Sequence, residues 1–259
     1  MDRDDLQVKL DRVLHDHGVR IRDADQWKVR DDVFDEVTLL ALYKLIHKKM
    51  ITGVGGSIST GKEANVLYGE KDGDALAIKI YMIRTANFKA MTEYIDGDPR
   101  FSNVRRTRKE IIFAWTKKEF SNLSRARDAG VRVPTPYAFD RNILLMEFLG
   151  EEGHAYTQLR YAEMDDPPAV YQSVVGDMKL LFSKAKLVHA DLSEYNILWD
   201  GERHYVIDMG QAVTLDHPRA LQFLMRDVRN VNRFFSTFGD IVEDKSLFES
   251  IAGDSISRI

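Results

Sequence analysis

Cysteine is absent from the 259-residue sequence. This absence excludes a disulfide scaffold, a thiolate zinc site, an iron–sulfur cluster and cysteine nucleophilic catalysis, although seven histidines leave other metal sites open. No apolar run reaches the roughly 18 to 20 residues that a membrane-spanning helix needs. The first residues, MDRDDLQVKLDR, carry charges where a secretory signal has its apolar core. We therefore expect a soluble, unexported protein that is located in the cytoplasm.

An excess of either charge is also missing. The 37 Lys and Arg residues are balanced by 41 Asp and Glu residues, so the formal net charge is -4 and a uniformly basic coat for nucleic acid is absent. No internal repeat, low-complexity tract or Pro/Gly/Ser-rich linker divides the chain. Because 44% of the residues are hydrophobic, a buried core is expected, and the sequence predicts one continuous folded unit.

The spacing of apolar residues predicts a first half rich in strands and a second half rich in helices, with the boundary near Gly150. In the first half we expect helices over 5–17 and 33–49, an antiparallel meander of about 30 residues over 51–81, a polar mobile loop over 84–104, a long helix from Thr107, and two more strands before Gly150. In the second half we expect helices over 168–186, 216–238 and 243–252, with short strands at NILW and YVID. The expected domains are a helical extension (1–50) packed on the rest, a sheet lobe (51–149) and a helical lobe (150–259).

A glycine-containing loop between two predicted strands is the first candidate for chemistry. Residues 56–62, GSISTGK, match the spacing of a Walker A loop, but Glu63 follows where that loop needs a Ser or Thr to bind magnesium. The next segment also has the pattern of a strand and not of a helix. We therefore interpret the loop as a turn whose backbone amides cover nucleotide phosphates. The alternative is an ordinary polar hairpin turn.

A lysine inside an apolar strand, Lys79 in ALAIKIY, is the second candidate. A buried lysine is costly to desolvate and needs an anionic partner. Glu119 on the long helix can face the sheet, and nucleotide phosphates are a second partner. The alternative places Lys79 on the solvent face of an edge strand, because the strand alternates Leu76, Ile78 and Ile80 with Ala75, Ala77, Lys79 and Tyr81.

The strongest candidate is the segment LVHADLSEYNIL, which YVIDMG follows at short range. Phosphoryl transfer from a metal–nucleotide needs a carboxylate that orients or deprotonates the acceptor, together with oxygen ligands for the metal. Asp191, Asn196 and Asp208 offer these three groups. His189 is better interpreted as a packed support for the loop than as an acid or a base.

In this order, the glycine loop, strand lysine, helix glutamate, catalytic loop and metal aspartate match the signature set of protein kinases. More closely, the chain resembles the RIO family of atypical protein kinases, and in particular its Rio-one branch. The resembling segments are STGKEA, AIK, KEFSNL, MEFL, LVHADLSEYNIL, IDMGQAV and FLMRDVRNVNRFF, and they cover the chain from about residue 35 to the end. The resemblance implies an α+β, two-lobed protein-kinase-like fold with ATP and Mg²⁺ or Mn²⁺ between the lobes.

The resemblance also implies roles for individual residues. Asp191 is the catalytic carboxylate, Asn196 and Asp208 are metal ligands, and Asp208 is also associated with an aspartyl-phosphate intermediate. Lys79 positions the phosphates and pairs with Glu119, for which Glu110 is the rival. The residues expected at ATP are Ile58, Ser59, Lys62, Glu63, Val66 and Lys79, with a hinge formed by Met146, Glu147, Phe148 and Leu149.

The implied function is transfer of the ATP γ-phosphate to serine or threonine, including autophosphorylation, or ATP hydrolysis at the same site, in maturation of the small ribosomal subunit. The segment after Asp208 contains no A-P-E, so a peptide-docking platform of the conventional kind is not expected. Two alternatives stay open. One is a small-molecule phosphotransferase of the aminoglycoside type, and the other is an ATP-gated, non-catalytic module for ribosome assembly.

Two further features have two interpretations each. Asp227 either accepts amide hydrogen bonds from the catalytic loop, as in kinases, or forms a surface ion pair with Arg226 or Arg229. Residues 100–127 hold nine basic residues, which form either a solvated helix face or a contact for ribosomal RNA in a pre-ribosomal particle. Hydroxyl-bearing residues beside this run make self-phosphorylation there a further hypothesis.

Overall fold

The computed structural model describes residues 8, 12, 14–16, 18–21 and 35–253. Two compact units interleave along the sequence. Unit 1 comprises residues 1–91, 104–120 and 136–155, and unit 2 comprises residues 92–103, 121–135 and 156–259. Among the helices of the described residues, none has the length and apolar content needed to cross a membrane.

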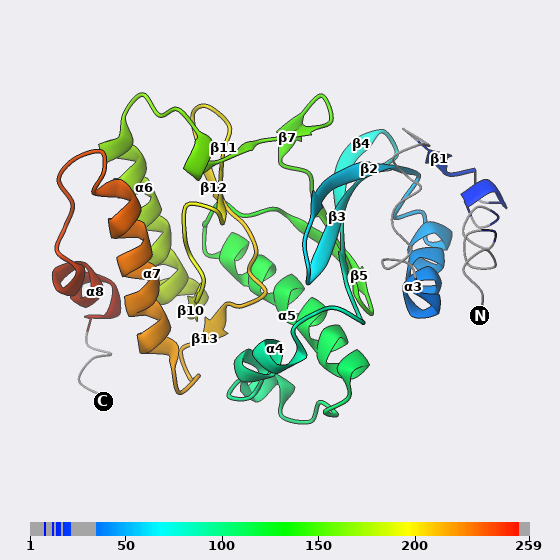
Figure 1. Ribbon diagram of the computed structural model, residues 1–259, viewed down its shortest axis with the longest axis horizontal. Coiled ribbons are helices and arrows are strands. Elements are labelled where there is room, and N and C mark those ends of the chain that lie inside the picture. The colour runs from blue at the N-terminus through cyan, green and yellow to red at the C-terminus, as the bar shows by residue number, and fades with distance from the viewer. Residues whose placement is uncertain (1–7, 9–11, 13, 17, 22–34, 254–259) are drawn as a thin grey trace. The chain divides into compact units, whose positions relative to one another are not determined.

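Unit 1 is built on a six-stranded sheet with the order β1-β2-β3-β4-β6-β5 (Figure 1). Its strands are β1 (Arg20–Ile21), β2 (Gly53–Thr60), β3 (Ala64–Lys71), β4 (Asp74–Tyr81), β5 (Pro136–Asp140) and β6 (Ile143–Glu147). Neighbours are antiparallel, except that β1 runs parallel to β2. The meander predicted over 51–81 is therefore confirmed as β2, β3 and β4, the two further strands are β5 and β6, and β1 is an additional strand that we did not expect.

Helix α3 (Glu36–His47) packs on one face of this sheet. Asp35 caps its N-terminus, because the Asp35 side chain accepts a hydrogen bond from the Thr38 amide at 2.8 Å and so satisfies a free N–H of the first turn. The apolar side of α3 is buried against Ile78 and the residues opposite it on the neighbouring strands. Each such side chain contributes about 1.5–3 kcal/mol on burial. The helix predicted over 5–17 lies largely outside the described residues.

The segment 84–104 corrects the sequence-based expectation of a polar loop. It contains helix α4 (Phe88–Ile95) and the single turn η1 (Pro99–Phe101) before the long helix α5 (Arg108–Asp128). Met91 and Ile95, four positions apart, are both buried, which gives α4 an apolar side. The helix is only eight residues long and lies within polar sequence, so its apolar spacing was too short to stand out.

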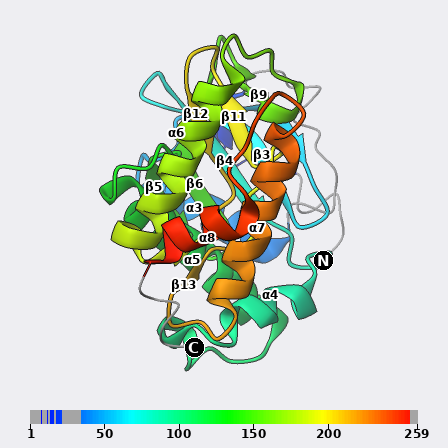
Figure 2. The same ribbon diagram turned by 90° about the vertical axis from the view of Figure 1, so that its left-hand side faces the viewer.

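Unit 2 is mainly helical. Its helices are α6 (Pro167–Leu180), extended by the π-helical turn η3 (Leu181–Ala185), α7 (Ala220–Phe235) and α8 (Asp244–Ala252), and α6 and α7 lie side by side (Figure 2). Short strands carry the loops between them: β9 (Thr157–Gln158), β10 (Leu187–Val188), β11 (Ile197–Trp199), β12 (His204–Val206) and β13 (Val213–Thr214). Strand β10 pairs with β13, and the others form a sheet with the order β12-β11-β9. The helices predicted for this half are confirmed.

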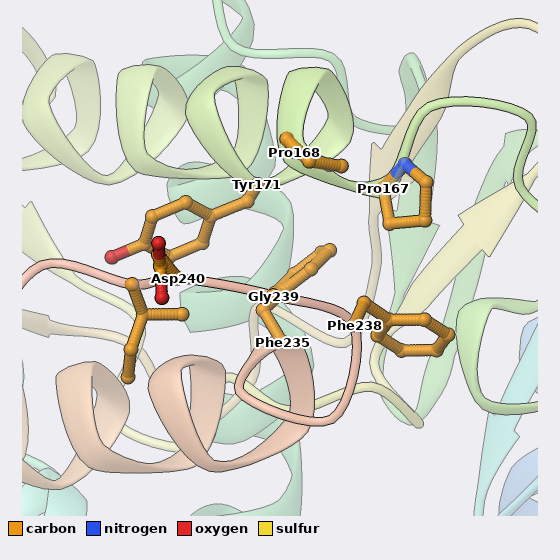
Figure 3. A pocket seen from close by; sticks show the side chains of 8 residues that line it. Pro167, Pro168, Tyr171, Phe235, Phe238, Gly239 and Asp240 are labelled. Atoms are coloured by element: carbon orange, nitrogen blue, oxygen red, sulfur yellow. The ribbon is translucent and has the colours of Figure 1, made fainter.

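A small pocket marks the place where α6 begins and α7 ends (Figure 3). Pro167 lies at the start of α6, and Phe238 follows the end of α7. The Tyr171 hydroxyl donates to Asn232 Oδ1 at 2.8 Å and accepts from the Val242 amide at 3.3 Å, and burial raises the pKa of Tyr171. The pocket volume of about 10 Å³ has room for one water molecule. These contacts therefore join the helices of unit 2 and leave no space for a ligand.

Candidate active site

Lys79 and Glu119 form a buried ion pair in unit 1. The Lys79 Nζ and Glu119 Oε1 atoms are 2.8 Å apart, and the two side chains are 9% and 1% exposed. The Tyr81 hydroxyl donates to the other oxygen of Glu119, and the Lys79 ammonium lies 5.1 Å from the centre of the Tyr81 ring. Glu110, the rival partner, is exposed in the first turn of α5. Because β4 lies between β3 and β6, the edge-strand interpretation of Lys79 is wrong.

The sheet register places the glycine-containing loop next to this pair. Ser59 on β2 lies opposite Val66 on β3, and Val66 lies opposite Lys79 on β4. Residues directly opposite each other on antiparallel strands share one face of a sheet. The side chains of Ser59, Val66 and Lys79 therefore point to the same face, which is the opposite face from the one that α3 covers. The loop joins the antiparallel strands β2 and β3. A Walker A loop is followed by a helix, so the Walker A interpretation is wrong.

The tip of this hairpin is open to solvent. Ser59 and Lys62 are exposed, whereas Ile58, Glu63 and Val66 are half-buried. The Lys62 carbonyl accepts a hydrogen bond from the Thr85 hydroxyl at 2.8 Å, and the Glu63 carbonyl accepts one from the Met82 amide at 2.8 Å. Two contacts thus hold the base of the hairpin while its tip stays accessible.

The predicted hinge follows the same face of the sheet at the end of β6. Met146 lies opposite Ala77, two residues before Lys79, and Met146 and Glu147 are half-buried. Phe148 and Leu149 are buried. The chain then turns at Gly150, where an added Cβ would lie 2.1 Å from the His154 carbonyl oxygen, so only glycine fits.

In unit 2, one loop between β10 and β11 carries Asp191 and Asn196. The Asn196 Nδ2 atom donates to the Asp191 carbonyl at 2.8 Å and to Asp191 Oδ2 at 3.2 Å. Gln211 Nε2 donates to the same Oδ2 atom at 3.0 Å. Asp191 is thus fixed by two amide donors, and the Asn196 side chain is left with its carbonyl oxygen, Oδ1, as the atom that can bind a cation.

Asp208 lies close enough to Asp191 for the two charges to interact. Burial raises the pKa of Asp191, His189 lowers it, and the negative charge of Asp208 raises it further. The backbone is strained beside both carboxylates, because Ala190 and Asp208 have φ angles of 66° and 61°. A non-glycine residue in this left-handed region costs about 1–2 kcal/mol. Strain of this kind is typical of functional sites.

Helix α7 holds the loop from one side. Asp227 is 1% exposed, and its two oxygens accept hydrogen bonds from the Ala190 amide at 2.7 Å and the Leu192 amide at 3.0 Å. Arg226 donates to the Ala190 carbonyl, and Asn230 donates to the Leu192 carbonyl at 3.1 Å. Of the two interpretations of Asp227, the structure confirms the one in which it accepts amide hydrogen bonds from the loop. Burial raises its pKa to about 7, while the two amides act in the opposite direction.

His189 supports the loop from within. It is 1% exposed, and burial lowers the pKa of its imidazole, so the neutral ring is favoured. Its Nε2 atom lies 3.0 Å from the Ile207 carbonyl, which makes Nε2 the protonated nitrogen. The ring therefore joins the Asp191 loop to the segment just before Asp208.

The Asn196 and Asp208 side chains could bind a metal ion that a substrate also helps to bind. In the described part of the chain, no group of three or more His, Asp and Glu residues can hold a metal by itself. Asp208 and Asn196 Oδ1 supply two oxygen atoms. Mg²⁺ typically takes one or two protein ligands and completes its shell with phosphate oxygens and water. The two oxygen-bearing side chains present, Asn196 and Asp208, therefore fit a magnesium–nucleotide.

The structure gathers the predicted site residues into two groups, one in each unit. It also adds four side chains to which the sequence assigned no role at the site: Tyr81 at Glu119, Gln211 at Asp191, and Arg226 and Asn230 at the catalytic loop. Gln211 follows YVIDMG directly, Arg226 directly precedes Asp227, and Asn230 follows Asp227 by three residues. The sequence could have indicated Gln211, Arg226 and Asn230 only through their closeness to a segment that was already recognised.

Comparison with known proteins identifies close relatives. The family described as "RIO domain" matches residues 65–247. The RIO-type serine/threonine-protein kinase Rio1 of Haloferax volcanii is 46% identical over 254 residues, which cover 97% of this chain and 87% of that protein. Rio1 of Methanocaldococcus jannaschii is 37% identical, covering 90% and 80%. Human RIO1 is 34% identical, and the chain spans 44% of its length.

Solved structures agree on the fold. The Rio2 kinase of Chaetomium thermophilum, in a complex titled ADP/Mg²⁺-phosphoaspartate, has a TM-score of 0.64 and 22% sequence identity, covering 84% of this chain and 67% of that one. A second structure of the same kinase has a TM-score of 0.63. The predicted α+β kinase-like fold, with an antiparallel sheet unit and a helical unit, is confirmed.

Proposed function

The chain belongs to the RIO family of protein kinases, and from this premise we propose that it transfers the γ-phosphate of ATP to serine or threonine hydroxyls of proteins, itself included. The observation that carries the proposal is the fixed Asp191 carboxylate, held by Asn196 and Gln211 in a loop that α7 anchors. The names of the relatives, which are serine/threonine-protein kinases, support the nature of the acceptor.

In the proposed reaction, the acceptor oxygen attacks the γ-phosphorus while Asp191 accepts the hydroxyl proton. The bond between the γ-phosphorus and the bridging oxygen breaks, and ADP leaves with that electron pair. Burial keeps the pKa of Asp191 above its ordinary value, which makes it a better proton acceptor than an exposed aspartate. The amides of Asn196 and Gln211 hold the carboxylate in one orientation.

Lys79 has the role of phosphate positioning in this proposal. Glu119 accepts a hydrogen bond from its ammonium, Tyr81 donates to Glu119, and Lys79 lies on the face that also carries Ser59 and Val66. Asn196 and Asp208 would hold Mg²⁺ or Mn²⁺, which neutralises the negative charge of the phosphates when bound. The residues of the hairpin tip and the hinge would contact the nucleotide, as the resemblance implies.

ATP hydrolysis through an aspartyl-phosphate is the second candidate reaction. The printed title of the Chaetomium structure describes ADP, Mg²⁺ and phosphoaspartate in that protein. We propose that Asp208 can accept the γ-phosphoryl group in the same way, after which water attacks the acyl phosphate and releases inorganic phosphate and the carboxylate. We propose further that the protein acts in the cytoplasm on small-subunit ribosome maturation, for which the family resemblance is the support.

Contact with ribosomal RNA through residues 100–127 is part of that proposal. Several of the nine basic residues are exposed, among them Arg105, Arg106 and Lys109. Others are not available, because Lys118 is fully buried and Arg100 pairs with Asp98 at 2.6 Å. The contact, if formed, therefore uses the exposed start of α5 and the residues just before it.

The test is incubation of the purified protein with γ-labelled ATP and Mg²⁺, measuring free phosphate and label on the protein. Lys79→Ala, Asp191→Ala and Asp208→Ala are expected to lose both signals, while Asp216→Ala, an exposed aspartate outside the site, keeps them. Label that survives acid but is lost in alkali identifies a serine or threonine ester, whereas label that is lost in both acid and alkali, and is released by neutral hydroxylamine, identifies an acyl phosphate. Wild-type protein that does not bind ATP would refute the proposal, and phosphorylation of small alcohols in place of protein would favour the aminoglycoside-type alternative.

A further inference from the structure

Two exposed tyrosine rings lie next to the catalytic loop of unit 2. Tyr161 and Tyr195 are 70% and 45% exposed, and Tyr161 is the most exposed large apolar side chain of the described residues. The ring centroids are 6.5 Å apart and the planes meet at 73°. Tyr195 directly precedes Asn196. The two rings form an aromatic corner, and Tyr195 lies four residues after Asp191 in the sequence.

Hydrogen bonds fix this corner in place. The Arg160 amide donates to the Glu194 carbonyl at 3.1 Å, and Gln158 Nε2 donates to the Tyr195 carbonyl at 3.0 Å. Strand β9 and the single turn η2 (Leu159–Tyr161), which bears Tyr161, are thus bonded to the loop that carries Asp191 and Asn196. A preformed aromatic surface binds a partner at a low cost in conformational entropy.

Glu194, between Asp191 and Asn196, provides a second and independent observation. The residue is 9% exposed, and in the described part of the chain its Oε2 atom is buried without a hydrogen-bond partner. No lysine, arginine or histidine of the described residues forms an ion pair with it. A buried carboxylate oxygen that lacks a hydrogen-bond donor is costly, so a donor or positive charge supplied by a bound partner would be favourable at Glu194.

We infer that Glu194, Tyr195 and Tyr161 form a subsite for a basic side chain, arginine above all, of the protein segment that accepts the phosphate. This inference rests on the proposed function. The guanidinium pairs with the Glu194 carboxylate and lies against the tyrosine rings, which attract cations through their π faces. Its position beside Asp191 gives the enzyme a preference for acceptor hydroxyls with basic neighbours.

The experiment compares two synthetic peptides as acceptors at one ATP concentration. The first contains Arg-Arg-Thr-Arg-Lys, the sequence of residues 105–109, and the second has its four basic residues replaced by glutamine. For the wild-type protein we expect kcat/KM to be about tenfold higher for the basic peptide, which corresponds to one charge-assisted contact. Glu194→Gln is expected to bring the ratio close to one.

Tyr161→Ala removes only an exposed ring, so folding is not at issue, and we expect it to lower the ratio about threefold. Tyr43→Ala, an exposed tyrosine of α3, is the matched control and keeps the wild-type ratio. Equal kcat/KM for both peptides in the wild type, while both are phosphorylated, would overturn the subsite alone. A ratio that falls in Tyr161→Ala but not in Glu194→Gln would also overturn it, because recognition of the basic side chain would then not involve the Glu194 carboxylate. Failure to label either peptide or the protein refutes the proposed function, and the subsite with it.

Discussion

Lys79 and Asp191 are each held by amide or carboxylate partners, but the two regions that hold them are built differently. Lys79 lies in the middle of a regular strand, and its partner Glu119 comes from one long helix. Asp191 lies in an irregular loop with strained backbone, and α7 fixes that loop through three side chains. In the first arrangement each buried charge is neutralised by its partner, so that loss of one partner alone is costly, whereas in the second a strained backbone keeps a carboxylate in position at a cost in stability.

The comparison shows in which unit the loss of a site residue should affect activity alone and in which it should also affect stability. In unit 1, the residue proposed for phosphate positioning neutralises a buried carboxylate, so its loss damages the fold as well as the site. In unit 2, burial and the nearby charge of Asp208 oppose ionisation of Asp191. Replacing Asp191 by a neutral group therefore removes an unfavourable charge together with the activity.

The largest effect is expected from Asp191→Asn. Loss of the proton acceptor should lower the rate of phosphoryl transfer by about 10³-fold, as for other general bases. Because the variant no longer carries the buried charge, its thermal midpoint should equal or exceed that of the wild type. Labelled ATP and thermal unfolding measure the two quantities. A variant that is clearly less stable would mean that the loop depends on the Asp191 charge.

Lys79→Met breaks the other side of the comparison. It leaves Glu119 without its ammonium partner, and the free energy of unfolding should fall by about 3 kcal/mol. The double variant Lys79→Met with Glu119→Gln should recover most of this loss while remaining inactive. Urea unfolding of the single and double variants gives the coupling between the two side chains. If the double variant is no more stable than Lys79→Met, the ion pair does not account for the loss.

The fold was largely predictable because its strands and long helices have strong periodicity. The alternation of Leu76, Ile78 and Ile80 is enough to identify a face that packs in a core, and the structure places α3 there. Helix α4 was missed because eight residues within a polar stretch give too short a pattern. The Asp227 contact with Ala190 joins residues 37 positions apart, so local sequence left both interpretations open. Such a contact is visible only after the chain has folded.

The pH dependence of stability should reveal the anchor in unit 2. Burial raises the pKa of Asp227 to about 7 in the folded protein, above its unfolded value near 3.9. Between these two values the folded state binds the additional proton, so this residue makes stability fall as pH rises from about 4 to about 7. The slope is at most about 1.4 kcal/mol per pH unit.

Asp227→Asn removes this titration. The stability difference between the variant and the wild type should therefore shift in favour of the variant as pH rises through that window, and stay constant above it. Urea unfolding at several pH values between 4 and 8 measures the difference. Asp216→Asn, at an exposed position, is the control. A difference that does not change with pH would show that Asp227 is ionised throughout.

The smallest effects come from removing one hydroxyl in each unit. Tyr81→Phe deletes the donor to Glu119, and Tyr171→Phe deletes the hydroxyl that bonds Asn232 and the Val242 amide. Each should lower the free energy of unfolding by about 1–2 kcal/mol, because a buried partner is left unsatisfied. Only Tyr81→Phe should also weaken ATP binding, since its partner Glu119 holds Lys79. ATP titration beside urea unfolding separates the two effects. Equal ATP affinity in both variants would show that Glu119 holds Lys79 in position without the Tyr81 hydroxyl.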